Sequence, residues 1–243
     1  LLRCAIEQAF RADAAFLVVQ SFLSVQPVYR KIGFFPVDER PSHQVGVGIA
    51  IAGLALLPLI TGLPLLLGPI HIAVLEMVID PVCSLVFEAE SAEPDLMQRP
   101  PRPPDSSLFA RPMLGWSLFQ GAVVMLATST LTLSLASTAL SMAAVRSAAF
   151  LALTLGIIAL ILLNRSFARS SLSTIRRPNI AFVIILSGVV LMLLASQTLP
   201  AVAALFQFAP ITWPVALLIM TASAVVCIML DLLRHSIRPR LIS

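Results

Sequence analysis

Long apolar segments constrain this chain more than any other feature of its sequence. Six apolar runs of about 20 residues, the length that a helix needs to cross a bilayer, alternate with polar loops. Barrel strands would be about half as long and would alternate in polarity. The composition agrees: 58% of the residues are hydrophobic, 12% are charged, and the mean hydropathy is +0.97. We therefore predict an all-α membrane protein with six transmembrane helices.

The predicted membrane domain covers residues 45–243. Residues 1–44 are mixed in character and contain no run long enough to cross a bilayer, so we assign them to a poorly defined cytoplasmic segment. The six spans are expected at residues 45–67, 70–87, 113–135, 147–163, 180–195 and 211–233.

Basic residues gather on one side of this topology. The N-terminal segment, the loops at residues 88–111 and 164–179, and the tail hold fifteen of the sixteen Lys and Arg residues. Arg146 is the remaining one and is expected on the opposite side. Cytoplasmic loops are enriched in Lys and Arg, so we predict a multi-pass plasma-membrane protein with both termini in the cytoplasm.

Several function classes are not indicated. The arginines flank apolar runs rather than forming a basic patch with aromatic residues, so nucleic-acid binding is not predicted. The sequence has no Gly-rich phosphate loop, no zinc-ligand spacing and no nucleophile elbow. Cys4, Cys83 and Cys227 are scattered and are expected to be free thiols. This chain alone is therefore expected to hold no cofactor and to hydrolyse no ATP.

Two carboxylates, Glu76 and Asp80, lie near the middle of the second predicted span. Residues four apart lie on one face of a helix, one turn from each other. A charge at membrane depth costs about 2.5–3.5 kcal/mol on insertion scales, so these acids indicate a function. Asp231 has a simpler explanation, because it can pair with Arg234 one turn away. His71, at the start of the same span, is expected to be interfacial rather than a ligand.

Prolines interrupt the first two spans beside these carboxylates. Pro81 has no N–H, so the backbone carbonyl of Met77 loses its helical donor. Pro58 has the same effect on the backbone carbonyl of Leu54. A carbonyl freed in lipid must be satisfied elsewhere, and a bound cation is one solution. The two acids and the two carbonyls therefore predict a cation-binding site, with reversible protonation of the acids or a buried polar pair as alternatives.

The stretch IHIAVLEMVIDP and the loop after it resemble the sixth transmembrane helix of P-type cation-transporting ATPases. In that family an Asn or Glu, followed four residues later by an Asp, ligates the transported cation. Glu76 and Asp80 fall on those positions. The loop pattern E-x-x-x-P-D-x-M at residues 90–97 and the run RPPRPP at residues 99–104 also match. The likeness is to bacterial members similar to the calcium pumps.

This resemblance covers about residues 45–243 and implies the fifth to tenth helices of such a pump. It implies a fragment whose partners are the lipid bilayer, the missing cytoplasmic domains (phosphorylation, nucleotide-binding and actuator) and the first four helices. A complete pump would use ATP and Mg²⁺ to translocate a divalent cation such as Ca²⁺, or protons, across the bacterial inner membrane. Leu54 stands where calcium pumps carry a carboxylate, and the fourth span has no acid, so at most one cation site is expected.

Two other interpretations stay open at this level. A stand-alone secondary or proton-coupled cation transporter would explain the carboxylates but not the loop pattern. The other is a non-transporting membrane fragment. Ion flux through the isolated chain without ATP would distinguish the first, and an upstream coding region without pump domains would favour the second.

Overall fold

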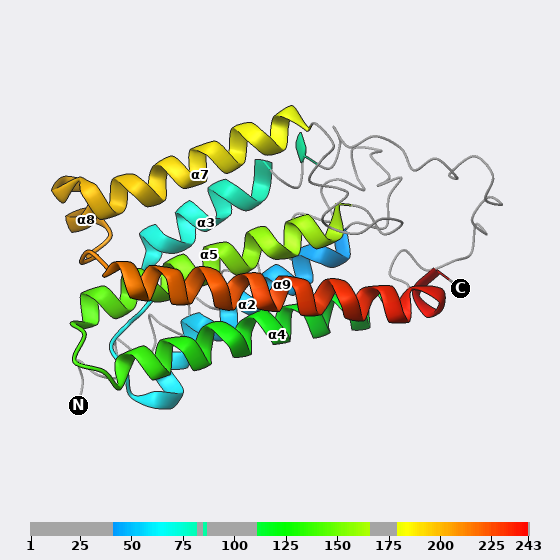
Figure 1. Ribbon diagram of the computed structural model, residues 1–243, viewed down its shortest axis with the longest axis horizontal. Helices are drawn as coiled ribbons and strands as arrows, with labels where there is room; N and C mark the ends of the chain where they lie inside the picture. Colours follow the sequence, from blue (N-terminus) through cyan, green and yellow to red (C-terminus); the bar gives the residue numbers. More distant parts are fainter. Residues whose placement is uncertain (1–40, 82–84, 87–110, 166–178, 243) are drawn as a thin grey trace.

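The protein is a bundle of helices, shown by a computed structural model in Figure 1. The structure describes residues 41–81, 85–86, 111–165 and 179–242. Within these ranges the elements are all helical: α2 (Pro41–Thr61), α3 (Pro69–Pro81), α4 (Arg111–Ala136), α5 (Met142–Asn164), α7 (Ile180–Thr198), α8 (Pro200–Leu205) and α9 (Trp213–Ile242). The all-α prediction is therefore confirmed for the described residues. The N-terminal residues 1–40 and the family-like loop at residues 90–104 lie outside them.

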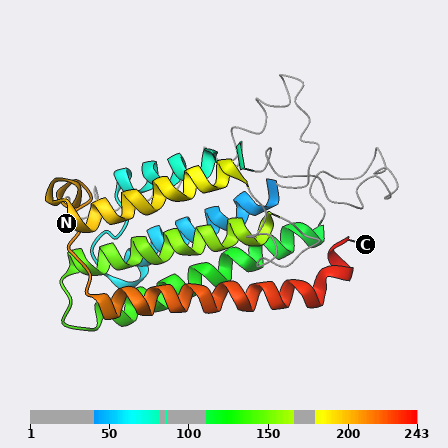
Figure 2. The same ribbon diagram turned by 45° about the horizontal axis from the view of Figure 1, so that its top comes forward.

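The long helices run up and down the bundle in alternation (Figures 1 and 2). Residues 62–68, 137–141 and 199–212 connect successive helices at one end, which we call the loop end. The start of α2 and the end of α9 both lie at the opposite end. This arrangement agrees with an even number of crossings between the start of α2 and the end of α9.

Within the part of the chain that the structure describes, four helices are long and apolar enough to cross a membrane, judged by length and composition. They cover Leu114–Ala136, Met142–Asn164, Ile180–Thr198 and Trp213–Ser236. The apolar parts of α2 and α3 are shorter, at Val45–Thr61 and Pro69–Ile79. The prediction of six full spans is thus not confirmed within the described residues, and the first two spans account for the difference.

The first predicted span, residues 45–67, is wrong at its end because α2 stops at Thr61. Gly62 adopts a left-handed backbone with φ of 74°, and its N–H donates to the carbonyl of Pro58 at 2.9 Å. A glycine in this conformation is a common helix terminator. Pro64 follows two residues later and has no N–H with which to continue the helix.

The second predicted span, residues 70–87, is described at residues 70–81 and 85–86. The α-helical part ends at Pro81, and residues 85–86 form a π-helical turn. Proline breaks the regular bonding pattern, and short π-helical pieces often occur at functional sites. The remaining four spans match helices, although α8 after the fifth span was not predicted.

Helix α5 is the centre of the bundle. Most of its apolar window is buried, whereas little of the corresponding windows of α7 and α9 is buried. A helix that is apolar on all sides is suited to such a central position. The outward-facing apolar side chains of α7 and α9 are suited to contact lipid, and they include Ile184, Leu191, Leu194, Leu218, Val225 and Leu232.

Glycines allow α2 to approach α4 closely. A Cβ atom added at Gly121 would lie 2.3 Å from the carbonyl oxygen of Gly46 and 2.7 Å from its Cα. These are backbone atoms, which cannot move aside as the tip of a side chain can. Small residues at helix crossings permit such contacts in membrane proteins, where van der Waals packing drives helix association. The α2–α4 pair therefore depends on glycine at these two positions.

We expect Gly121→Ala to destabilise the full chain by about 1–3 kcal/mol, because the new methyl group forces the two backbones apart. Thermal unfolding in detergent, followed by fluorescence-detected gel filtration, measures the change. Gly115→Ala on the same helix is the matched control, since a Cβ there meets nothing within 4 Å. Equal stability of the two variants would contradict the packing assigned to Gly121.

Candidate cation site on helix α3

Helix α3 carries most of the predicted site. Glu76 is half-buried near the middle of the helix. Met77 beside it has a side chain that is 72% exposed, so only its backbone carbonyl is suited to act as a ligand. Asp80 lies in the last turn, next to Pro81, and its side chain is outside the described part of the structure. The helical register places the two acids on one face, as the sequence predicts.

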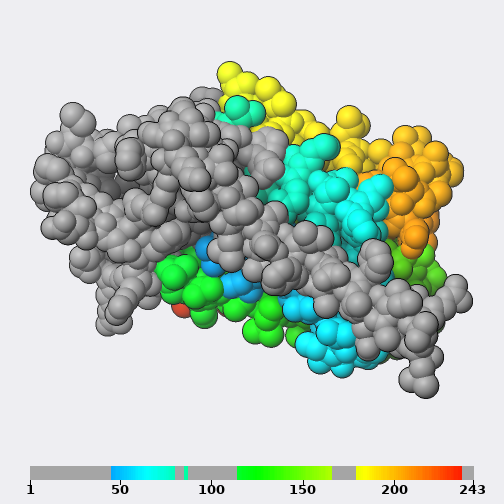
Figure 3. All heavy atoms as spheres, turned by 180° about the vertical axis from the view of Figure 1, so that it is seen from behind, coloured from blue at the N-terminus to red at the C-terminus, as the bar shows by residue number. Residues whose placement is uncertain are grey.

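The fourth predicted ligand, the carbonyl of Leu54, lies on another helix, α2. Leu54 is fully buried in α2, and Pro58 lies inside the same helix. Helix α2 packs closely against α4 and α5, whereas α3 runs beside α7. Figure 3 shows from behind that the surface of α3 adjoins α7 and α8. Leu54 nevertheless shares one buried apolar cluster with Leu75 and Ile79 of α3, so its place as a ligand beside Glu76 and Asp80 stays a prediction.

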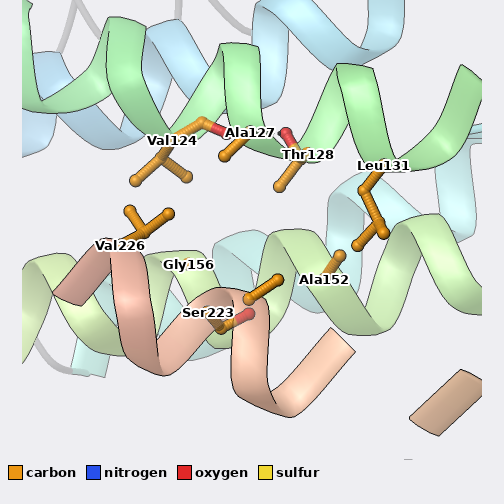
Figure 4. Close-up of a pocket in the computed structure, with 9 residues that line it drawn as sticks. Val124, Ala127, Thr128, Leu131, Ala152, Gly156, Ser223 and Val226 are labelled. Carbon is orange, nitrogen blue, oxygen red and sulfur yellow. Dashed lines mark hydrogen bonds between the residues drawn. The ribbon is translucent and has the colours of Figure 1, made fainter. Parts of the chain in front are cut away.

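A second location, the pocket between α4, α5 and α9, is unsuited to a cation (Figure 4). Its volume is about 20 Å³, enough for about one water molecule. Most of its lining is aliphatic, and the Thr128 hydroxyl already donates to the carbonyl of Val124 at 2.8 Å. Among the described residues no group of three or more His, Cys, Asp or Glu side chains is placed to hold a metal ion. Helix α3 thus remains the candidate.

The segment after α3 is held by Asn179, the N-cap of α7. The Asn179 side-chain oxygen accepts the N–H of Phe182 at 3.0 Å, and its Nδ2 donates to the carbonyl of Val86 at 3.0 Å. Val86 belongs to the π-helical turn and is fully buried. Asn179 is not among the residues predicted from the sequence, although an Asn before an apolar run is a helix-start signal. This one side chain joins the interrupted segment to α7.

The start of α3 is held by two residues at the loop end. His71 is only 3% exposed and bonds through both ring nitrogens, so it is packed within the protein, and its position at the membrane interface stays a prediction. Arg146 of α5 donates to the carbonyl of Leu65 from Nη2 at 2.8 Å and to the carbonyl of Gln207 at 3.1 Å. Its isolation from the other basic residues was the only sequence signal for this role. Side chains thus hold the start of α3 and the π-helical turn at residues 85–86.

Asp231 is confirmed as a structural residue. Its carboxylate accepts a hydrogen bond from Nη2 of Arg234 at 2.6 Å, as the spacing predicts. Arg234 is only 2% exposed, and its Nη1 donates to the carbonyl of Leu163 on α5. A buried arginine needs such partners, because an unpaired charge in a core is strongly destabilising. The Arg234 bond to Leu163 connects α9 to α5.

A family model described as "Cation transporting ATPase, C-terminus" matches residues 64–235, more than half of the chain. The chain belongs to this family. The matched range includes the whole of α3, with Glu76 and Asp80, so the P-type cation ATPase resemblance is confirmed at family level. A search of curated proteins found no match. In this C-terminal ATPase region the two acids lie on a short helix, α3.

The two hydrogen bonds of the Asn179 side chain predict how substitutions there change the stability of this ATPase region. Asn179→Ser keeps a capping oxygen but removes the donor to Val86, so we expect a loss of about 0.5–1.5 kcal/mol in unfolding free energy. Asn179→Ala removes the cap as well and should cost about 0.5–2 kcal/mol more. Thermal unfolding of the full chain in detergent measures both changes.

The control for this series is Ser141→Ala. Ser141 caps α5 by accepting the N–H of Ala144 at 3.3 Å, a bond that stays within one helix. The decrease in unfolding free energy of Ser141→Ala should equal only the part of the Asn179→Ala decrease that comes from removal of the cap. If Asn179→Ser is as stable as the unmodified chain, the bond to Val86 does not hold the interrupted segment.

Proposed function

We propose that this chain is the cation-translocating membrane domain of a calcium-pump-like P-type ATPase in a bacterial plasma membrane. The observation that carries the proposal is the family match over residues 64–235, which contains the two acids of α3. In such a pump, phosphorylation by ATP with Mg²⁺ occurs in cytoplasmic domains and moves the membrane helices. This chain contributes the path and the ligands for the ion.

The form of α3 supports a cation site around Glu76 and Asp80. The helix is short, ends at Pro81 and is followed by a π-helical turn. Transporters bind ions at discontinuous helices, where freed carbonyls and carboxylates meet near the middle of the membrane. Met77 offers its carbonyl from the same helix. The Leu54 carbonyl, beside Pro58 on α2, is proposed as a further ligand.

The distribution of charge supports an orientation. Arg165 and Arg234 lie near the end of the bundle where α9 terminates, whereas Arg146 lies at the loop end. The positive-inside rule then places the loop end outside the cytoplasm and both termini inside it. In this arrangement α2 and α3 are the shorter members of six membrane helices. A divalent cation such as Ca²⁺, or protons, would pass between the two faces.

The test is made in the complete pump that contains this region. Glu76→Gln and Asp80→Asn each remove one charged ligand, and we expect either change to weaken the apparent cation affinity by about 100-fold, or about 2.8 kcal/mol. Cation-stimulated phosphorylation by ATP measures this affinity. Met77→Leu is the control, because its exposed side chain has no assigned role and its carbonyl is unchanged.

Three outcomes decide between the functions. Loss in both acid variants with a normal Met77→Leu variant supports the proposed site. Normal cation stimulation in both acid variants rules out the site. Ion or proton flux through the isolated chain in liposomes without ATP would favour a stand-alone secondary transporter instead of a pump domain.

A further inference from the structure

A buried pair of amide side chains joins α4 to α5 near the end of the bundle opposite the loop end. Asn164 of α5 donates from Nδ2 to the carbonyl of Leu160 at 2.7 Å and to Oε1 of Gln120 on α4 at 3.2 Å. A carbonyl can only accept, so the bond to Leu160 fixes which atom of the Asn164 amide is the nitrogen. The oxygen of Gln120 must then face Asn164. The Nε2 group of Gln120 therefore points away from Asn164.

Two N–H donors of α4 are buried at this place. Gln120 is 1% exposed and Trp116 is 5% exposed. Among the described residues, neither Nε2 of Gln120 nor Nε1 of Trp116 has an acceptor. The two residues are four apart, so they lie one turn from each other on the same face of α4. Buried donors are costly without an acceptor, so this pair indicates that an acceptor binds here.

The chemistry of the two donors favours a neutral acceptor. N–H groups repel a cation, and an apolar molecule cannot accept their protons. A buried anion would need a positive charge beside it. Arg165 follows Asn164 in the chain, but its guanidinium lies 4.9 Å from the ring centroid of Phe182 on α7, so its charge is directed toward α7. Water needs no such charge and can accept from both donors.

The close contact between α2 and α4 favours a small acceptor. Ser117 and Gly121, which alternate with the two donors along α4, pack against the backbone of Gly46. This part of the bundle therefore has little room for a large ligand. Each helix carbonyl has a second lone pair, which can accept a proton from water. One water molecule can thus accept two bonds and donate others, in line with the about three bonds that buried waters make.

We propose that Trp116 and Gln120 bind an internal water molecule at this end of the contact between α4 and α5. The water accepts both N–H groups and donates to backbone carbonyls. It extends the bond between Asn164 and Gln120 into a chain of hydrogen bonds that reaches Trp116. All of these residues belong to α4 and α5, and neither acid of α3 takes part, so the site does not depend on the proposed function.

NMR spectroscopy of the full chain in a lipid nanodisc tests for this water. The chain has two tryptophans, so isotope labelling of the indole nitrogens gives two N–H signals, and Trp116→Phe identifies one of them by its loss. Cross-peaks between the Trp116 N–H and water are recorded in laboratory-frame and rotating-frame experiments. We expect opposite signs, which indicate a bound water, whereas equal signs indicate proton exchange. Trp213, which is 72% exposed, serves as the reference for an indole outside the core.

Substitution of Gln120 tests whether both donors share the water. Gln120→Leu keeps the approximate volume but removes the second donor, so we expect the Trp116 cross-peak to fall at least about twofold. Gln120→Met serves the same purpose if the Leu variant does not fold. Thr128→Val on the same helix is the matched control, because the Thr128 hydroxyl donates to the carbonyl of Val124 within α4. In this variant the Trp116 cross-peak should be unchanged.

Thermal unfolding gives a second measurement. Trp116→Phe and Gln120→Leu should each lower the midpoint by about 2–4 °C, because each removes one bond to the water. Their combination should lower it by less than the sum, since one water is lost only once. Trp116→Phe combined with Thr128→Val should give the full sum.

Four results would overturn the proposal. The first is an unmodified chain whose Trp116 N–H shows no bound-water cross-peak, or shows one to lipid instead. The second is an undiminished cross-peak in a folded Gln120 variant. The third is a rise in the midpoint on Gln120→Leu, which indicates a donor without a water. The fourth is a strictly additive loss in the Trp116 and Gln120 double variant, which indicates that no water is shared.

Discussion

A membrane interior offers no water to bond with the backbone, and the rest of this structure depends on that constraint. Regular helices satisfy their own N–H and carbonyl groups, but broken segments do not. In the described residues, side chains from other segments bond to these places. Arg146 serves the connection at residues 62–68, His71 serves the turn after α8, and Asn179 serves the π-helical turn. Each helix break is therefore also a joint between segments.

These hydrogen bonds explain how a helix as short as α3 is held in position. One end is attached through His71 and the other, beyond Pro81, through Asn179. Between them lie Glu76 and Asp80, the acids that the family match places in a cation ATPase. Side chains support this helix firmly. Pro81 leaves a backbone carbonyl beside the acids without its helical hydrogen bond. Both properties are useful to a site that binds and releases an ion.

The bundle around α3 is built by a different means. Because lipid is as apolar as the helices, burial of apolar area gives little driving force for helix association. Close packing between the helices must supply that driving force. Gly46 and Gly121 provide this between α2 and α4, and the buried pair of Asp231 and Arg234 fastens α9 to α5. Helix α5 lies at the centre of these contacts. The outer helices can then present apolar faces to lipid while the core stays fixed.

The sequence by itself determined the helical class, the approximate position of four long helices, the family and the Asp231–Arg234 pair. These follow from local patterns: apolar length, a motif and a one-turn spacing. Only the tertiary structure decided that α2 ends at Thr61 and that His71 is a buried junction. It also decided that α2 packs mainly on α4. The reason is physical, because such features depend on partners distant in sequence, and apolar runs of similar composition do not specify which neighbour they meet.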